Sequence, residues 1–136
     1  MNLKLYFLSL FLLTGCGDGN LSNRRIPIGT YEGTFQRDWV WGEDSIANIT
    51  LTFEGNRWSG TSNIAKYPAL CRGNYSIEGD KITFQNECPW TADFDWTLVL
   101  SGEYDLTKSD KTLEFSHDTR SATSDTYIDQ YRLVKK

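Results

Sequence analysis

The sequence predicts an all-β fold, an eight-stranded antiparallel up-and-down meander that closes into a small barrel. Apolar and polar residues alternate along most of the chain, and no window shows the 3.6-residue period of an amphipathic helix. Two-residue Gly-X turns occur at Gly55-Asn56 and Gly79-Asp80, and their type II′ geometry matches the twist of a hairpin. A barrel of this size has an interior just wide enough for side chains or one small ligand.

The strands are expected to follow one another along the chain, each with one apolar face turned inward. Their approximate ranges are 28–37, 46–54, 57–63, 71–78, 81–88, 96–106, 111–117 and 126–135. The side chains expected inside the barrel are Tyr31, Phe35, Ile49, Leu51, Phe53, Trp58, Tyr75, Ile77, Ile82, Phe84, Trp96, Leu98, Leu100, Tyr104, Leu113, Phe115, Tyr131 and Leu133. Because Trp96 has the inward parity, its truncation is expected to cost roughly 3–5 kcal/mol as a core cavity.

The turn at Gly79-Asp80 sets the register of the hairpin around it. Tyr75 then faces Phe84, and the opposite face of the hairpin is entirely polar. Since a slip of one residue would turn every side chain to the other face, this agreement supports the register. The same counting pairs Phe53 with Trp58 across the turn between the second and third strands.

For the sixth and seventh strands we place the connecting loop at 107–110. The counting then pairs Tyr104 with Leu113 and Gly102 with Phe115. In both pairs the apolar side chains keep the inward parity of their strands.

The connections between strands separate the two ends of the barrel. Alternate connections of a meander share an end, and the short turns at 55–56, 79–80 and 107–110 lie at the same one. Both termini join this closed end. The long connections, which are 38–44, 64–70, 89–95 and 118–125, form a loop-rich mouth at the opposite end.

The N-terminal segment is typical of a bacterial export signal. Lys4 is followed by the apolar run Leu5–Leu13, which is too short to span about 30 Å of hydrocarbon. Leu13-Thr14-Gly15-Cys16 resembles the lipobox of bacterial lipoproteins, which implies that Cys16 is acylated and anchors the protein in the lipid bilayer. The alternative is an ordinary cleaved signal with Cys16 nearby.

The expected organisation is a signal peptide at 1–15, a lipid-anchored polar tether at 16–27 and one β-barrel domain at 28–136. We expect the protein in the cell envelope, with the outer membrane favoured, and with the mouth directed away from the membrane. Removal of the signal takes only Lys4 from the charged residues, which leaves 13 Lys and Arg against 18 Asp and Glu. This acidic balance, without a basic stripe, argues against nucleic acid as a partner.

Cys71 and Cys88 are expected to form a disulfide. The register of their hairpin places them opposite each other at a non-hydrogen-bonded position, with Cα atoms about 4.5 Å apart. An exported protein folds in an oxidising compartment, where such a pair closes. Two buried free thiols are the alternative.

Neither catalysis nor a metal or cofactor site is expected. Asp93 and Asp95 share a face of an extended segment, and Trp90 and Trp96 beside them are able to stack on a sugar. We prefer the plainer interpretation, a solvated acidic loop with an aromatic plug. His117 is the only histidine, and no His, Cys and carboxylate cluster has metal-ligand spacing.

The predicted architecture resembles the lipocalin (calycin) family of small-ligand binders. Gly29-Thr30-Tyr31 is similar to the family's Gly-x-Trp, and Arg132 is similar to the basic residue that stacks over that ring. No helix follows the last predicted strand, although lipocalins have one there. Streptavidin-like barrels and bacterial protease-inhibitor barrels share the same general layout.

The resemblance implies a cavity that opens at the mouth and takes a small apolar or aromatic ligand. The expected ligand-binding side chains are Trp39, Trp41, Tyr67, Trp90 and Phe94 around the opening, with Phe35, Trp58, Tyr75 and Phe84 inside the barrel. The alternative is a protein-interaction module, such as a protease inhibitor or an assembly partner, with a filled barrel. An open pocket of a few hundred Å³ would favour the ligand, and a filled interior would favour the protein partner. The sequence leaves the oligomeric state open.

Overall fold

The structure is a computed structural model of the chain and describes residues 24–39, 45–121 and 126–136. The expected signal peptide, Cys16 and Trp41 lie outside the described residues. Among the described residues, no helix has the length and apolar character needed to cross a membrane.

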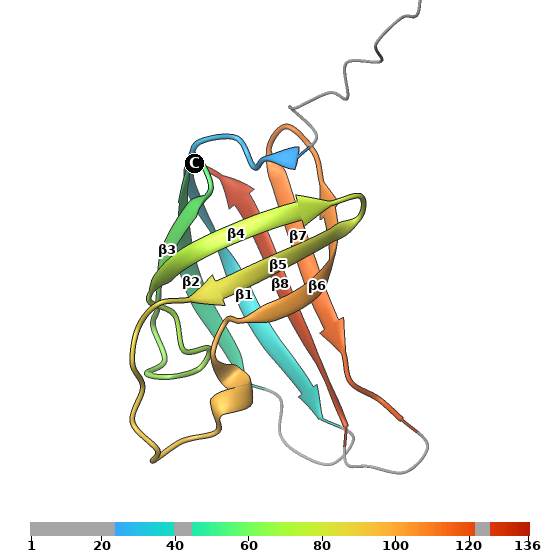
Figure 1. Cartoon of the computed structure of the whole chain (residues 1–136). Coiled ribbons are helices and arrows are strands. Elements are labelled where there is room, and N and C mark those ends of the chain that lie inside the picture. Colours follow the sequence, from blue (N-terminus) through green and yellow to red (C-terminus); the bar gives the residue numbers. More distant parts are fainter. Residues whose placement is uncertain (1–23, 40–44, 122–125) are drawn as a thin grey trace, which may run out of the picture.

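Eight antiparallel strands pair in chain order and close into a barrel, as the sequence predicts (Figure 1). The strands are β1 (Gly29–Trp39), β2 (Ile46–Glu54), β3 (Arg57–Ser62), β4 (Arg72–Glu78), β5 (Lys81–Asn86), β6 (Gly102–Lys108), β7 (Thr112–Asp118) and β8 (Tyr127–Lys135). β8 pairs with β1 over nine residue pairs, from Tyr31 opposite Lys135 to Trp39 opposite Tyr127, and this pairing closes the barrel.

The two Gly-X hairpins have the predicted register. Tyr75 pairs with Phe84 in β4–β5, and Phe53 pairs with Trp58 in β2–β3. Gly73 allows a close approach in this part of the sheet, because a Cβ atom there would lie 1.6 Å from the carbonyl oxygen of Gln85. Turn chemistry and alternation together were therefore sufficient to place these strands.

The predicted register of β6–β7 is wrong. Phe115 pairs with Leu106 rather than with Gly102, and Leu113 pairs with Lys108. The chain turns later than expected, because the Ser109 backbone N–H donates to the Thr112 carbonyl oxygen at 2.9 Å. The shift is four residues, an even number, so the inward faces are unchanged.

The first part of the predicted sixth strand is also wrong. Trp96–Leu98 forms a 3₁₀ helix, η2, and the strand begins only at Gly102. Asp95 caps this helix by accepting the Thr97 backbone N–H at 2.9 Å, a local hydrogen bond that competes with extended structure. Trp96 consequently points outward and is 57% exposed, so it is not a core residue.

Side chains fill the interior of the barrel. Every other residue expected inside is buried, except Leu98, which is half-buried and packs against the core. The rings form a continuous series of contacts: Phe84 packs on Phe115 with centroids 4.9 Å apart, and Phe115 stacks on Tyr131 at 4.4 Å. Tyr131 in turn contacts Phe35 at 4.7 Å.

The segment before β1 covers the closed end of the barrel. Ile26 is only 2% exposed and its backbone N–H donates to the Tyr75 hydroxyl at 3.0 Å. The same hydroxyl donates to the Gly55 carbonyl oxygen at 2.7 Å. In Figure 1 the C-terminus lies at this end, whereas β1, β3, β5 and β7 run towards the opposite, loop-rich end, as the meander predicts.

Candidate binding site at the loop-rich end

The Cys71–Cys88 disulfide ties the two described loops at the loop-rich end, as predicted. The Cα atoms are 6.3 Å apart, which is within the range of disulfides but wider than a ladder pair. The reason is that β4 begins at Arg72 and β5 ends at Asn86, so both cysteines lie just beyond the paired strands. The bridge thus joins the start of one loop to the end of the other.

Backbone hydrogen bonds fasten the 63–71 loop to the segment that contains η2. Ala69 donates to the Leu98 carbonyl oxygen at 2.9 Å and accepts from the Leu100 N–H at 3.2 Å. Ala69 is 1% exposed, so this junction is part of the packed end of the barrel.

Tyr67, an expected ligand-binding residue, closes the barrel at this end. Its ring packs edge-on against Phe35 with centroids 5.0 Å apart. Its hydroxyl accepts from the Arg37 backbone N–H at 3.1 Å and donates to the Ser45 carbonyl oxygen at 2.9 Å. These contacts give Tyr67 a structural role in the plug above the core.

A buried ion pair lies beneath this plug. Arg37 is fully buried, and its Nε and Nη2 donate to the two carboxylate oxygens of Asp129 at 2.6 and 2.7 Å. Burial alone would lower the pKa of Arg37, but the hydrogen bond and charge of Asp129 raise it above the ordinary value, so the guanidinium stays charged.

Arg37 also holds η2 and two aromatic rings in place. Its Nη1 donates to Thr97 Oγ1 at 2.8 Å and contacts Asp95 Oδ2 at 3.2 Å. The guanidinium lies 3.6 Å from the centroid of the Tyr127 ring and 5.4 Å from that of Trp39. One side chain therefore connects β1, β8 and the η2 segment.

Sequence reasoning missed this ion pair, although a signal was present. Arg37 and Asp129 both have the inward parity of their strands, and they are directly opposed in the β1–β8 pairing. Opposite charges at inward positions of the first and last strands are the pattern that would have indicated the pair.

Trp90 and Trp96 flank a pocket of about 330 Å³ at the rim of the barrel. It lies between the end of β5 and the start of β6, and its other lining residues are Asn86, Cys88, Pro89, Val99 and Ser101. Trp90 is half-buried, and its Nε1 is buried without a hydrogen-bond partner among the described residues. The pocket brings together Trp90, an expected ligand-binding residue, and Trp96, which was expected in the core.

The loop 89–95 folds on itself beside this pocket. Phe94 packs edge-on against Trp90 at 5.7 Å, and the Lys66 ammonium lies 5.0 Å from the Phe94 centroid. Lys66 also forms an ion pair with Asp93 at 2.9 Å, which joins the two described loops a second time. The Trp96 indole Nε1–H donates to the Thr91 carbonyl oxygen at 2.8 Å, and the residue remains exposed.

Asp93 is expected to titrate well below an ordinary carboxyl. The Thr91 hydroxyl and then Lys66 lower its pKa from 3.8 to about 2. Because the folded-state pKa is lower than the unfolded one, this interaction stabilises the loop above about pH 4 and is lost as the pH falls towards 2.

A ¹³C NMR titration should find a raised Asp93 pKa in Thr91→Val and in Lys66→Met, but not in Thr107→Val. An unchanged titration in both loop variants would contradict this geometry.

The expected interior ligand-binding residues belong to the packed core. Phe35, Trp58, Tyr75 and Phe84 are all 5% exposed or less. Trp58 donates its Nε1 to the Asn74 carbonyl oxygen at 3.1 Å and packs against Phe84 at 5.8 Å. Of the expected rim residues, Trp39 is 39% exposed and contacts Tyr127 at 5.5 Å.

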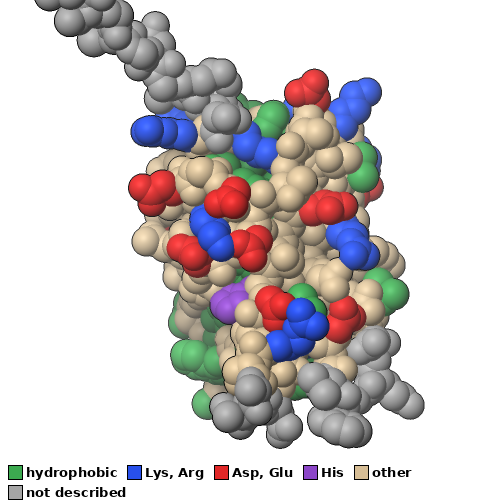
Figure 2. Space-filling view, turned by 90° about the vertical axis from the view of Figure 1, so that its right-hand side faces the viewer, with side chains coloured by type: hydrophobic (Ala, Val, Ile, Leu, Met, Phe, Trp, Pro, Cys, Tyr) green, Lys and Arg blue, Asp and Glu red, His purple; other side chains and the backbone are tan. Residues whose placement is uncertain are grey.

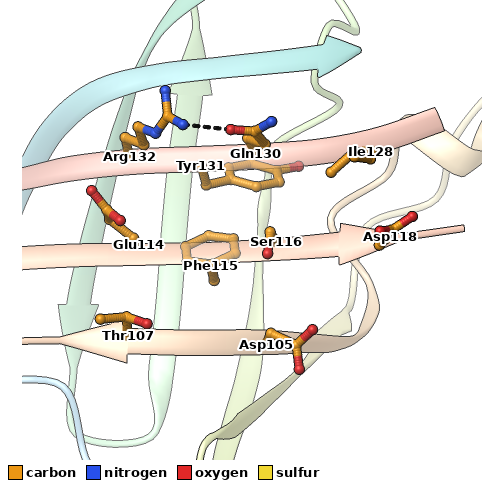
Figure 3. A pocket seen from close by; sticks show the side chains of 10 residues that line it. All are labelled: Asp105, Thr107, Glu114, Phe115, Ser116, Asp118, Ile128, Gln130, Tyr131 and Arg132. Carbon is orange, nitrogen blue, oxygen red and sulfur yellow. Dashed lines mark hydrogen bonds between the residues drawn. The ribbon is translucent and has the colours of Figure 1, made fainter. Parts of the chain in front are cut away.

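The basic residue expected over Tyr31 is elsewhere. Arg132 lies on the outer face of β8 and donates to Gln130 Oε1 at 2.6 Å (Figure 3). Tyr31 is buried at the closed end, where its hydroxyl donates to the Pro27 carbonyl oxygen at 3.0 Å. The inward parity of Tyr31 and the outward parity of Arg132 keep them apart, so this lipocalin-like contact is absent between these two residues.

A shallow groove of about 400 Å³ on the outside of β6–β8 is a weaker candidate (Figure 3). Its side chains are mainly polar and include Asp105, Glu114 and Arg132. Acidic and basic side chains are interspersed over the neighbouring surface, with the chain's only histidine among them (Figure 2). Such a mixed surface is what solubility requires of an outward sheet face.

Within residues 24–39, 45–121 and 126–136, no group of three or more His, Cys, Asp or Glu side chains is placed to hold a metal ion. Comparison with protein-family models, with curated proteins and with solved structures gives no match for this chain. The function must therefore be inferred from the geometry of the barrel and its two ends.

Proposed function

We propose that this protein is a lipid-anchored protein-interaction module of the bacterial cell envelope. The observation that carries the proposal is that the barrel is packed where a ligand cavity was expected. Phe84 alone contacts Trp58, Tyr75 and Phe115. A solid barrel acts as a rigid support, and binding then depends on the residues displayed at its loop-rich end.

The surface at the loop-rich end suits a protein partner. Trp96 and Trp39 are 57% and 39% exposed, and aromatic side chains of this kind contribute most to protein interfaces. Two charged pairs near this surface are formed within the protein, Lys66 with Asp93 and Arg37 with Asp129. An approaching partner would therefore be able to bury aromatic surface without separating these pairs.

The anchor at Cys16 would orient this surface. The described chain begins at the closed end, so acylation upstream would hold the loop-rich end away from the bilayer. We expect Cys16→Ser to leave the membrane fraction or to accumulate unprocessed, without labelled palmitate. A Cys16→Ser protein that still takes up palmitate and sediments with membranes would refute the anchor.

Site-specific photo-crosslinking tests the interaction surface. A benzoylphenylalanine in place of Trp96 is expected to crosslink one defined protein in the native host, because the ring is exposed at the loop-rich end. Val134, which is 55% exposed on the end of β8, is the matched control and should give no such product. Equal crosslinking at both positions would contradict the proposal.

Trp96→Ala should weaken the complex while changing the free energy of unfolding by no more than about 1 kcal/mol.

A small-molecule carrier is the second candidate, favoured by the pocket of about 330 Å³ between Trp90 and Trp96. This volume is at the lower limit of ligand sites, so it would admit one small apolar or aromatic group. Native mass spectrometry of protein from its own host distinguishes the two functions. A retained small molecule that Trp90→Ala releases would favour the carrier over the interaction module.

A further inference from the structure

Basic side chains gather at the closed end although the chain as a whole has a net charge of −4. They come from the segment before β1, the β6–β7 turn and the end of β8. We call them the basic rim, which consists of Arg24, Arg25, Lys108, Lys111, Lys135 and Lys136. Asp110 is the only acidic residue of the three segments 24–28, 108–112 and 134–136.

The three segments of the basic rim are in direct contact. Lys108 Nζ donates to the Arg25 carbonyl oxygen at 3.2 Å, and the Lys135 backbone N–H donates to the Lys111 carbonyl oxygen at 2.7 Å. Figure 2 shows several Lys and Arg side chains at the upper end of the molecule, with acidic side chains near them. The rim is therefore one continuous sector of the closed end.

Most of this charge faces outward. Lys136 forms an ion pair with Glu32 at 2.6 Å, whereas Arg24, Arg25 and Lys111 are exposed. Besides Glu32 on β1, the closed end carries Glu54 at the β2–β3 turn and Glu78 and Asp80 at the β4–β5 turn.

Two exposed aliphatic side chains accompany the bases. Ile28 is 67% exposed and directly precedes β1, and Val134 is 55% exposed on β8 beside Lys135. Bases next to isolated apolar side chains are the combination that binds the interface of an anionic bilayer. The bases attract the headgroups, and the apolar side chains enter the boundary layer.

The position of the proposed anchor brings a bilayer within reach of the basic rim. Cys16 precedes Arg24 by eight residues, which span at most about 28 Å when fully extended. We infer that the basic rim rests on the anionic lipid headgroups of the membrane that holds Cys16, with Ile28 at the interface. This inference rests on the lipid anchor of the proposed function, and it adds a second membrane contact that fixes the orientation of the barrel.

A polarity-sensitive fluorophore on an introduced cysteine tests the contact in the full, lipidated protein. Cys71 and Cys88 are bridged, so Ile28→Cys supplies a free thiol at the closed end. Ile46→Cys is the matched control, because Ile46 is 58% exposed on the end of β2 that adjoins the loop-rich end. On vesicles containing phosphatidylglycerol, the probe at position 28 should shift to the blue and the probe at 46 should not. The shift should weaken in high salt and on pure phosphatidylcholine vesicles.

Charge reversal tests the role of the bases in the same assay. Arg24→Glu with Arg25→Glu is expected to lower the ratio of membrane-contacting to non-contacting protein by at least tenfold, because each of the two bases near an anionic surface contributes roughly fivefold. Arg72→Glu with Arg120→Glu, at the loop-rich end, makes the same change in net charge and should have no such effect. Equal responses of the two pairs, or of the probes at 28 and 46, would overturn the inference, as would crosslinking of the position-28 thiol to a protein.

The acylation of Cys16 and the membrane contact of the basic rim can be refuted independently of each other. The mass of the mature protein reports whether Cys16 carries acyl chains, whatever the fluorophore does. If Cys16 is unmodified, the anchor is refuted, and adding the labelled protein to preformed anionic vesicles still decides the rim. If Cys16 is acylated and neither probe shifts, the barrel is tethered without resting on the headgroups.

Discussion

Replacing Asp129 by Asn is expected to lower the free energy of unfolding by about 3–5 kcal/mol, because it leaves a buried charge without its partner. Arg37 is fully buried, and two of its nitrogens donate to the Asp129 carboxylate. An amide has only one acceptor oxygen, so the substitution also leaves a guanidinium N–H facing an amide NH₂. Urea denaturation followed by tryptophan fluorescence measures the loss.

Two controls separate the buried pair from its surroundings. Asp95→Asn removes the other carboxylate near Arg37, but Asp95 is 44% exposed, so the loss should be about 1 kcal/mol or less. The double variant Arg37→Met with Asp129→Leu removes both charges and should recover most of the stability lost in Asp129→Asn. An Asp129→Asn protein as stable as Asp95→Asn would show that the pair is not sealed from water.

Hydrogen exchange should locate the effect of the Asp129 substitution. Arg37 also donates to the Thr97 hydroxyl and carbonyl oxygen at 2.8 and 3.0 Å. Freed from Asp129, the guanidinium is expected to lose this position, so the amides of η2 should exchange faster. The β4–β5 hairpin has no contact with the pair and should keep its protection.

Removing the disulfide with Cys71→Ala and Cys88→Ala is expected to cost about 3 kcal/mol, since the bridge closes a loop with a sequence separation of 17. The bridge holds the wall of the Trp90–Trp96 pocket, because Cys88 lines it. The variant should therefore also loosen the candidate site. Urea denaturation of the oxidised protein, the reduced protein and the double variant measures the effect.

Reducing agent supplies the control for the disulfide. It should lower the stability of the native sequence to that of the double variant and leave the double variant unchanged. Before that comparison, mass spectrometry of the unreduced protein should find Cys71 and Cys88 in one linked peptide. Recovery of both thiols in alkylated form would exclude the bridge under the conditions tested.

The strands and most of their registers follow from local features of the sequence. Alternation places Tyr75 and Phe84 on an inward face, and the Gly79-Asp80 turn sets them opposite each other. The disulfide then follows, because the same counting brings Cys71 and Cys88 together just beyond the paired strands. Each of these steps depends only on neighbouring residues and on the two-residue period of a strand.

Local alternation fails where a side chain offers the backbone another partner. Trp96 keeps the inward parity, but the Asp95 carboxylate caps η2 and turns the indole outward. In the β6–β7 hairpin, the Ser109 and Thr112 hydroxyls bond to each other at 2.6 Å and move the turn towards Asp110-Lys111. The alternation of inward and outward side chains applies to an extended chain. It therefore does not predict the residue at which the extended conformation ends.

What only the tertiary structure decided is the content of the barrel and the partner of each inward charge. Residues that line a ligand cavity and residues that fill a core have the same inward parity. This is the case for Phe35, Trp58, Tyr75 and Phe84. Whether rings leave a cavity depends on the volumes of side chains from all eight strands, which meet only after the barrel closes. Arg37 and Asp129 likewise come from the first and last strands, 92 residues apart. Their inward parity can be read from the sequence, but their pairing arises only when β1 and β8 meet at the seam of the barrel.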